Sequence, residues 1–234
     1  MESTVLTLPD GTAVRVVGKI DRVDVYRAGD TAYVRVVDYK TGAKNFRLDE
    51  VVEGLNLQML LYLFSLWDNA GDRFGGTATP AGVLYLPAKL PVIAVAAGDS
   101  EEDRARERLK VMQMNGLMLN DPDVLSAMEA DGKGVFIPVK LKKDGTPDAR
   151  AAVATLAQFG QLKKRAEALL CEMASTLRRG DVAAVPANSE RLNACTYCDY
   201  AAVCGHEAGD AVREIKPYDT KTVLSMLSED FEEE

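Results

Sequence analysis

The stretch from residue 18 to residue 42 constrains the fold of this chain more than any other part of the sequence. Residues 18–24 and residues 36–42 each surround an aspartate with residues that favour β-strands. Between them, Ala-Gly-Asp-Thr at residues 28–31 is typical of a hairpin turn. The pattern predicts an antiparallel hairpin that places the two acidic segments side by side.

Three charged side chains converge in this predicted hairpin. Side chains alternate across a strand, so Asp38 and Lys40 point to one face, and the paired strand can present Asp21 beside them. Both aspartates lie where a strand leaves an apolar run, and a charge there is costly to desolvate unless it is paired or bound to a metal. Carboxylates are ligands that Mg2+ prefers, and a nearby ammonium group stabilises charge that develops on a phosphate. The hairpin therefore favours a metal site for phosphodiester hydrolysis.

A simpler interpretation of the same residues is a surface hairpin whose charges form exposed ion pairs of small energetic value. On spacing alone, this alternative and the metal site are equally supported. Asp24 cannot share the face of Asp21 in a regular strand, so we expect it to be structural or to support the site from behind.

A helix is predicted from Asp49 to about Trp67, because apolar residues recur there at helical spacing. Gln58 and Tyr62 lie four residues apart on this helix, hence on one face, within an otherwise apolar stretch. Taken alone, they favour buried polar groups that the backbone satisfies. Beside the hairpin they become candidates for holding the attacking water or a DNA phosphate.

Three of the four cysteines of the chain, Cys195, Cys198 and Cys204, are clustered. In a chain without secretory features, such clustering favours metal or iron-sulfur ligation over disulfides. Zinc and a 4Fe-4S cluster both need four ligands, and both remain open. His206 would complete a Cys3His zinc site, whereas Cys171 stands in a setting that is typical of a core.

Charge and hydropathy restrict the class of protein. A net charge of -8 argues against a protein that grips nucleic acid by bulk electrostatics on its own. No segment resembles a signal peptide, and no apolar run reaches the length that a membrane span needs, so we expect a soluble, cytoplasmic protein without a membrane partner. No glycine-rich phosphate loop is present, so ATP use is not expected within this stretch.

The remaining pattern predicts strands and helices in alternation. Strands are expected within 4–40 and at 81–86, 92–97 and 135–141, a loop at 71–80, and helices at 49–67, 101–115 and 149–179. This order predicts an α/β core with a helical arm over residues 1–185, followed by a cysteine-rich cap and an acidic tail over residues 186–234.

Four features of the sequence together resemble the RecB-type branch of the PD-(D/E)XK nucleases. They are the Gly-x-Ile-Asp segment at residues 18–21, Asp-Tyr-Lys-Thr-Gly at residues 38–42, the Gln58-x3-Tyr62 pair and the cysteine spacing. Within that branch they are similar to the carboxy-terminal nuclease domains of the AddB type. The likeness covers nearly the whole chain. It implies a restriction-endonuclease-like core, in which helices flank a central mixed sheet, with a C-terminal cysteine-rich cap.

The resemblance also implies roles for the hairpin and helix residues. It implies three oxygen ligands for Mg2+ or Mn2+, namely Asp21, Asp38 and the main-chain carbonyl of Tyr39. Lys40 would be the catalytic lysine, and Gln58 with Tyr62 would match the glutamine-tyrosine motif of the family. The implied activity is that of a metal-dependent DNA exonuclease.

Cys195, Cys198 and Cys204 would match the last three ligands of the family's 4Fe-4S cluster. Relatives place the first cluster cysteine well before the nuclease motifs, whereas only 17 residues precede Gly18 here and none of them is cysteine. We therefore expect an incomplete cluster in this chain unless Cys171 substitutes. The implied partners are DNA, mainly single-stranded ends, and a helicase-nuclease partner protein of the AddA type that acts in double-strand-break repair and recombination.

Two alternatives stay open beside the nuclease domain. A catalytically incomplete fragment would serve as a DNA-binding or structural module, which the acidic charge allows. A zinc-bearing interaction domain would contain zinc in place of the iron-sulfur cluster.

Overall fold

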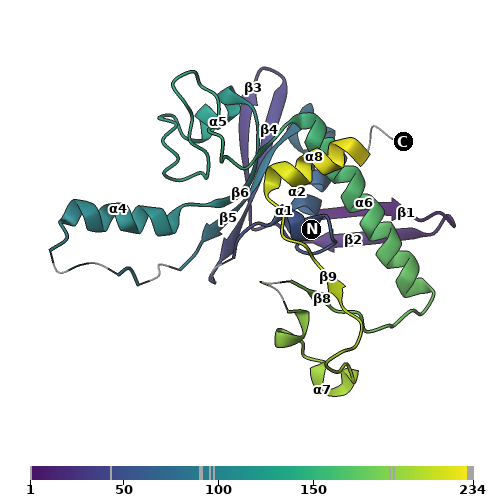
Figure 1. The fold of residues 1–234 in the computed structure, drawn as a ribbon. Coiled ribbons are helices and arrows are strands. Elements are labelled where there is room, and N and C mark those ends of the chain that lie inside the picture. The colour runs from purple at the N-terminus through teal and green to yellow at the C-terminus, as the bar shows by residue number, and fades with distance from the viewer. Residues whose placement is uncertain are drawn as a thin grey trace.

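A mixed five-stranded sheet forms the centre of the fold (Figure 1). The computed structural model describes residues 2–42, 44–89, 92–94, 96, 98–189, 191 and 193–230. The strands of the sheet, in spatial order, are β3 (Arg22–Ala28), β4 (Thr31–Lys40), β5 (Thr77–Pro87), β6 (Asn115–Leu119) and β7 (Val153–Ala154). The β3–β4 and β5–β6 pairs are antiparallel, and the β4–β5 and β6–β7 pairs are parallel. The predicted α/β class with a central mixed sheet is confirmed.

The β3–β4 hairpin forms as predicted. Ala28 pairs with Thr31 at the turn, and Gly29 there has a φ of 57°, a left-handed conformation that glycine adopts without steric cost. Along β4, alternate residues face opposite sides of the sheet, so Val36 belongs to one buried cluster and Val37 to the other. This alternation determines which face the charged end of β4 presents.

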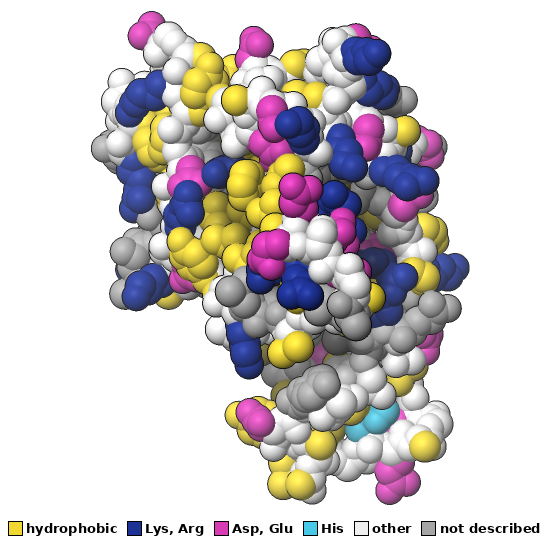
Figure 2. Space-filling model, turned by 90° about the vertical axis from the view of Figure 1, so that its left-hand side faces the viewer, with side chains coloured by type: hydrophobic (Ala, Val, Ile, Leu, Met, Phe, Trp, Pro, Cys, Tyr) yellow, Lys and Arg dark blue, Asp and Glu magenta, His cyan; other side chains and the backbone are white. Residues whose placement is uncertain are grey.

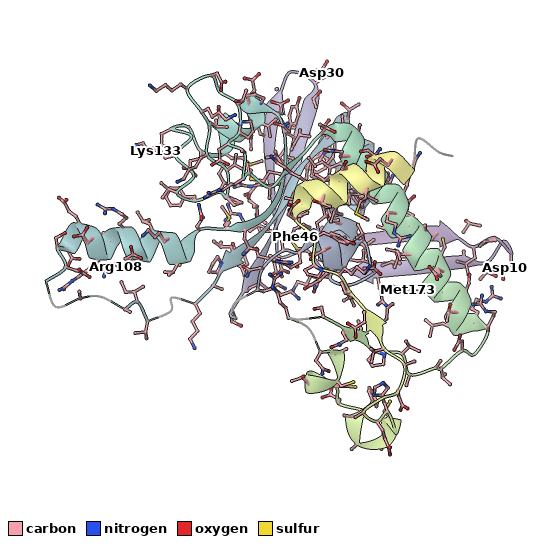
Figure 3. All side chains as sticks on the ribbon, viewed as in Figure 1. Asp10, Asp30, Phe46, Arg108, Lys133 and Met173 are labelled. Atoms are coloured by element: carbon pink, nitrogen blue, oxygen red, sulfur yellow. The ribbon has the colours of Figure 1, made fainter. Side chains whose placement is uncertain are left out.

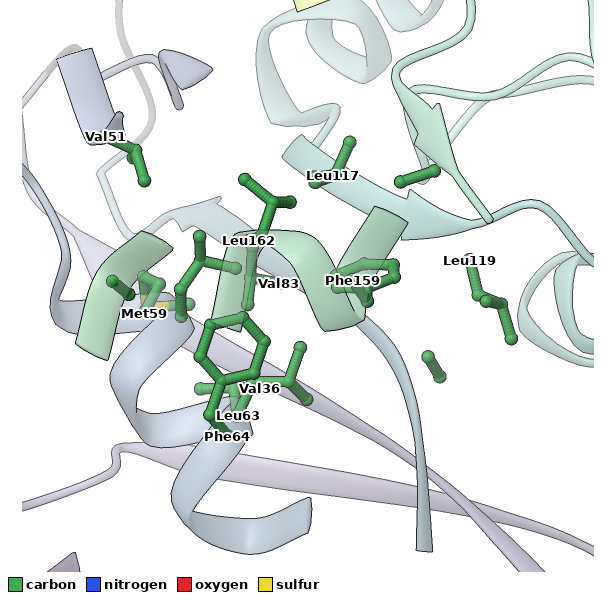
Figure 4. Close-up of a cluster of buried hydrophobic side chains, with 14 of the residues drawn as sticks. Val36, Val51, Met59, Leu63, Phe64, Val83, Leu117, Leu119, Phe159 and Leu162 are labelled. Atoms are coloured by element: carbon green, nitrogen blue, oxygen red, sulfur yellow. The ribbon is translucent and has the colours of Figure 1, made fainter. Parts of the chain in front are cut away.

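Helices cover the face of the sheet that carries Val36. They are α1 (Leu48–Val51), α2 (Gln58–Asp68), α3 (Ala70–Phe74), α6 (Leu156–Arg178) and α8 (Thr220–Asp230). In Figure 4, side chains of the sheet meet those of α2 and α6 in one cluster, and six members that are at most 4% exposed are Val36, Val83, Leu117, Leu63, Phe64 and Leu162. Each such side chain contributes about 1.5–3 kcal/mol on burial, so this layer holds the sheet and α2 in a fixed relation.

The opposite face of the sheet carries a smaller core. Val37, Leu84 and Met118 of the sheet pack there with Leu125 of α5 (Pro122–Met128) and with the following loop. Pro122 begins this helix, and the Asp121 carboxylate accepts hydrogen bonds from the main-chain N–H groups of two helical residues. The sheet is thus buried on both faces near its centre.

A second hairpin flanks the helical layer. It consists of β1 (Glu2–Thr7) and β2 (Ala13–Gly18), which pair in an antiparallel two-stranded sheet and pack against α2 and α6. Arg178 at the end of α6 binds Asp10 and Thr12 in the turn of this hairpin. The segment that leads into Asp21 is thereby attached to the helices.

Helix α4 (Glu101–Met112) forms an arm that projects from the sheet (Figure 1) and has no buried residue. Ser100 caps it by accepting a hydrogen bond from Asp103 N–H. The predicted helix was extended too far, because residues 115–119 form β6. Gly116 allows β6 to lie close to β5, since an added Cβ would be 1.9 Å from the carbonyl oxygen of Val83.

The predicted single helix at 49–67 is wrong, because α1 and α2 are separated by a turn at 52–57. Gly54 and Asn56 there have φ values of 85° and 53°, which a right-handed helix cannot contain. The predicted helix at 149–179 begins only at Leu156, where Thr155 and Gln158 form a capping box.

The predicted strand at 135–141 does not form, because the buried Glu129 carboxylate accepts the N–H groups of Val135, Phe136 and Ile137. Residues 77–80, which were predicted to be loop, belong to β5. Of the predicted strand at 92–97, Val95 and Ala97 lie outside the described residues, and the remainder is not in a strand.

The cysteines of the last part of the chain lie in short elements away from the sheet (Figure 1). These elements are β8 (Ala187–Asn188), the 3-10 helix η1 (Ala194–Tyr197), α7 (Ala201–Cys204) and β9 (Arg213–Glu214). The chain then returns to the core as α8, which packs against α6 and α1. In the part of the chain that the structure describes, no helix combines the length and apolar character that crossing a membrane requires.

Candidate active site

The C-terminal end of β4 presents Asp38 and Lys40 on one face. This is the face of Val36, so both charged groups continue a buried row of side chains. Asp38 is 6% exposed, and the Lys40 Nζ atom lies 2.5 Å from its Oδ2 atom. The predicted surface hairpin with solvent-exposed pairs therefore does not describe Asp38, which is buried.

Asp21 immediately precedes β3 and lies beside the same strand end. Arg22 pairs with Val37, so the next position of the antiparallel register sets Asp21 opposite Asp38. The Asp21 Oδ2 atom accepts a hydrogen bond of 3.2 Å from the main-chain N–H of Tyr39. The structure thus brings the two predicted carboxylates and Lys40 to one end of the hairpin.

Tyr85 of β5 forms the floor beside these charges. It stands opposite Asp38 in the parallel register, and its ring centroid lies 5.1 Å from Lys40 Nζ. Burial first, and then the negative charges of Asp38 and Glu50, raise the pKa of the Tyr85 phenol to about 12. The phenol stays neutral at ordinary pH, and its ring face stabilises the ammonium group. Sequence analysis gave Tyr85 no role, because its position beside Lys40 depends on the β4–β5 pairing.

Gln58 and Tyr62 are in contact on α2. The Tyr62 hydroxyl oxygen accepts hydrogen bonds from Gln58 Nε2 at 3.1 Å and from the main-chain N–H of Lys19 at 3.2 Å. Gly18 makes this approach possible, because a Cβ there would lie 2.3 Å from the Tyr62 ring. The pair is therefore attached to the segment that leads into Asp21.

Asn115 fixes the loop that follows Lys40, a role that sequence analysis missed. Its Oδ1 atom accepts the N–H of Phe46 at 2.6 Å, and its Nδ2 atom donates to the Lys44 carbonyl at 3.0 Å. Phe46 lies near the centre of the molecule (Figure 3), with its ring centroid 6.2 Å from that of Tyr85. In the sequence this asparagine stood at the end of the helix predicted for residues 101–115 and gave no indication of this role.

Asp24 does not join the two other aspartates. It pairs with Arg22 and Arg35, each at 2.7 Å. Burial by itself would raise the pKa of Asp24, but hydrogen bonds from the two guanidinium groups outweigh it, so the pKa is lowered. Its role is to pair charges within the hairpin.

Comparison with known proteins decides the family. Residues 1–205 match the model of the PD-(D/E)XK nuclease superfamily. The chain belongs to this superfamily. Similar proteins include an ATP-dependent helicase/deoxyribonuclease subunit of the AddB type from Thermoanaerobacter sp. (strain X514), which is 31% identical over 230 residues, with 96% of this chain and 20% of the relative covered. The protein of the same name from Ruminiclostridium cellulolyticum is 35% identical over 202 residues, with 86% and 18% covered.

The protein of this name from Acetivibrio thermocellus is 32% identical over 234 residues, with 98% of this chain and 20% of the relative covered. The chain therefore spans about a fifth of the length of these relatives. The predicted membership of the PD-(D/E)XK nucleases, with relatives of the AddB type, is confirmed.

Nucleases of the PD-(D/E)XK superfamily use divalent metals, and the donor atoms at the end of β4 suit such an ion. The buried Asp38 Oδ2 atom accepts no aligned hydrogen bond from the described residues, although the Lys40 ammonium pairs with it. The Lys40 carbonyl accepts Ala88 N–H on the β5 side. Because successive carbonyls of a strand alternate in direction, that of Tyr39 points to the side of Asp21. Carboxylate and carbonyl oxygens are hard ligands.

The candidate site offers too few carboxylates to surround a metal ion with protein ligands alone. Among the described residues, no group of three His, Cys, Asp or Glu side chains is arranged to hold a metal. A divalent ion held by Asp21 and Asp38 would therefore have to take its further oxygen ligands from the Tyr39 carbonyl and from water, a pattern that is usual for Mg2+.

The predicted cysteine site forms a separate hollow. Cys195, Cys198, Cys204 and His206 line a cavity of 300 Å3, and all three thiols are exposed. Cys171 lies on α6 and is not among the residues that line the cavity. Three thiols and one imidazole have the chemistry of a zinc donor set, but among the described residues these four side chains are not arranged as a group that could hold a metal ion. Cys171, which lies outside the cavity, does not supply a fourth thiol for a cluster.

Proposed function

We propose that this chain is a deoxyribonuclease domain that hydrolyses phosphodiester bonds of single-stranded DNA ends with the help of Mg2+ or Mn2+. The observation that carries the proposal is the buried Asp38, whose Oδ2 atom lacks an aligned donor, beside Asp21 and Lys40 at one strand end. Asp21, Asp38 and the Tyr39 carbonyl would hold the ion. A buried carboxylate is costly unless it is paired with an ammonium group, as Asp38 is with Lys40, or also binds a metal ion.

Each residue of the site has its own role in the proposed hydrolysis. The ion, when bound, lowers the pKa of a water molecule and neutralises charge on the leaving oxygen. Lys40, held between Asp38 and the Tyr85 ring, places its ammonium where it orients that water and stabilises charge on the phosphate. The exposed Gln58 amide, fixed by Tyr62, positions the scissile strand.

The names of the relatives support a partner for this domain. Each relative is named as one subunit of an ATP-dependent helicase/deoxyribonuclease, so we infer that the chain acts in the cytoplasm with a helicase-nuclease partner protein of the AddA type. Double-strand-break repair and recombination require this combination of unwinding and cleavage. A helicase would deliver single strands, which explains how an acidic domain with a net charge of -8 obtains its substrate.

The cysteine hollow supports a second, non-catalytic metal centre. We infer that Cys195, Cys198 and Cys204 bind either part of a 4Fe-4S cluster or zinc, the latter with His206 as fourth ligand. Anaerobic iron, sulfide and zinc analysis of the purified protein separates the two. A protein that contains neither metal would contradict this assignment.

Cleavage of a labelled single-stranded oligonucleotide tests the proposed reaction. We expect cleavage with Mg2+ or Mn2+ and none with a chelator, and a loss of about 10²-fold or more in Asp38→Asn and in Lys40→Ala. Asp30→Asn is the matched control, because Asp30 is exposed in the turn at the other end of the same hairpin (Figure 3). Cleavage that survives both site variants would refute the site. Metal-independent DNA binding without cleavage would instead favour a DNA-binding module.

A further inference from the structure

A cavity of 530 Å3 opens directly beside Lys40. Its walls come from the loop after β4, from the end of β5 and from the base of the α4 arm. Six residues that define it are Lys40, Lys44, Asn45, Tyr85, Lys89 and Val111. The volume lies in the range of about 300–1,000 Å3 that is usual for small-ligand sites. The proposed metal ligands Asp21 and Asp38 are not part of its lining, so the cavity adjoins the metal site without including it.

The charge of this cavity is opposite to that of the protein. Lys40, Lys44 and Lys89 line it, and no Asp or Glu is among the described lining residues. The chain as a whole has a net charge of -8. A concave surface that carries one sign of charge concentrates ligands of the opposite sign. The cavity therefore selects an anion.

Two of its polar groups are available to a ligand. Within the described part of the chain, Lys89 and Asn45 make no hydrogen bond or ion pair, and both are exposed. The Lys44 Nζ atom lies 2.5 Å from Asn56 Oδ1, and Asn56 Nδ2 lies 2.5 Å from Glu50 Oε2. Lys44 is thus oriented at the rim, whereas Lys89 and Asn45 are free to bind.

An apolar wall faces these lysines. It includes Tyr85, Pro87 and Val111. A bare phosphate gains nothing from such a surface, whereas a nucleobase and a sugar bury apolar area against it. The combination of lysines, a free amide and an apolar wall is suited to a whole nucleotide.

The cavity is held in shape by contacts across the fold. Asn115 binds the main chain of residues 44 and 46, and Gln113 Nε2 donates to the Gly134 carbonyl at 2.5 Å. Figure 2 shows hydrophobic side chains gathered at the centre of the face on the α4 side, bordered by both basic and acidic side chains. A preformed site loses little entropy when it binds a flexible strand.

We propose that this cavity binds one nucleotide of a single DNA strand, next to the phosphodiester that the metal site cleaves. Lys44 and Lys89 hold its phosphate, and its base lies against Pro87, Tyr85 and Val111. A paired base inside a duplex cannot enter such a cavity without being flipped out, so the site favours single strands. The position relative to the cleaved bond rests on the proposed function, but the binding does not.

Fluorescence anisotropy with a labelled oligothymidylate in the presence of a chelator tests this binding without cleavage. We expect the double variant Lys44→Gln/Lys89→Gln to bind about tenfold more weakly. The magnitude of the slope of log K against log salt should fall by about 0.7, since the two lysines hold a single phosphate and each neutralised phosphate of a single strand contributes about 0.7. The control Lys142→Gln/Lys143→Gln removes the same charge from two exposed lysines of a turn that does not line the cavity. It should change affinity less than twofold.

A strand of abasic residues of the same length tests the apolar wall. The wild-type protein should bind it about tenfold more weakly than oligothymidylate, since stacking and apolar contact with the base are lost. The affinity of the cavity variant should be lower than that of the wild type by the same factor for both strands. Equal affinity of the wild type for both strands would overturn the role of the base, and thymidine monophosphate that competes as well as the oligonucleotide would show a free-nucleotide site instead.

The two proposals can fail separately. Lysine-dependent binding of single strands in a protein that cleaves nothing would support the cavity and refute the reaction. The opposite outcome is metal-dependent cleavage in which the cavity variant and its control have the same KM and the same salt slope. This result would support the reaction and overturn the cavity. Equal binding of a duplex of the same sequence would also overturn it.

Discussion

The strand ends of β4 and β5 and the cysteine segment at 187–215 both gather chemically reactive side chains, but they are held in different ways. Asp38 is 6% exposed and lies in the central sheet between two paired strands. The three clustered cysteines are exposed, and the described residues of their segment pair internally through the two-residue strands β8 and β9 and through one isolated bridge between Asn188 and Asn193. The sheet therefore orders its site before any ligand binds, whereas the cysteine segment needs a ligand or partner to gain comparable order.

The strongest test of this contrast is Gly116→Ala. The added Cβ would lie 1.9 Å from the Val83 carbonyl oxygen, so β6 must move away from β5 or the backbone must distort. We expect the free energy of unfolding to fall by about 3 kcal/mol, measured by urea denaturation. Gly98→Ala is the control, because nothing lies within 4 Å of a Cβ there. A change of the size of the control would show that the sheet is less rigid than we infer.

Gly18→Ala tests whether the helix pair depends on the hairpin. The new Cβ would displace the Tyr62 ring, which lies 2.3 Å from its position. We expect cleavage to fall by about 10- to 100-fold, because small misplacements near a reacting group are costly. Gly71→Ala, on α3 and in a position with open space, should keep activity. If Gly18→Ala keeps activity as well, the Gln58–Tyr62 pair is not needed for cleavage.

Asp49 connects the two regions, because its carboxylate binds the main chain just after the cysteine segment. Asp49 pairs with Arg47 at 2.8 Å and accepts the N–H of Tyr218 at 3.1 Å. Burial would raise the pKa of Asp49, but the bonds from Arg47 and Tyr218 outweigh it and lower the pKa below 3.8. We expect Asp49→Asn to lose about 1 kcal/mol at neutral pH.

The lowered pKa gives this prediction a direction in pH. The stabilisation is present above the unfolded pKa of 3.8 and is lost as the pH falls through the lower folded value. The free energy of unfolding, measured from pH 5 downward, should therefore fall more steeply for the wild type than for Asp49→Asn. Parallel curves would show that Asp49 does not carry this connection.

Cys198→Ser should have the smallest effect. In the presence of a chelator we expect the free energy of unfolding to change by less than about 0.5 kcal/mol, because the thiol is exposed. Calorimetry with and without the chelator measures this. A loss of about 2 kcal/mol in the metal-loaded protein, absent after chelation, would sharpen the contrast by showing that a bound metal orders the segment. The same loss in both conditions would contradict it.

Sequence analysis succeeded where the pattern is local and failed where distant groups compete. The hairpin, its turn and the shared face of Asp38 and Lys40 follow from alternation over a few residues. The predicted strand at 135–141 was lost because Glu129 accepts its N–H groups, a bond that no periodicity reveals. The predicted helix at 49–67 was broken by the left-handed Asn56, which pattern alone did not indicate.

The sequence by itself determined the local face on which the candidate site residues lie, because strand and helix periods operate within a few residues. Its motifs also indicated the PD-(D/E)XK superfamily, which the match over residues 1–205 confirmed. Only the tertiary structure decided that Asp38 is buried, that Tyr85 lies beneath Lys40, and that Asn115 fixes a loop about 70 residues away. These features depend on which strands pair and how the layers pack, and that is decided by the burial of the whole core.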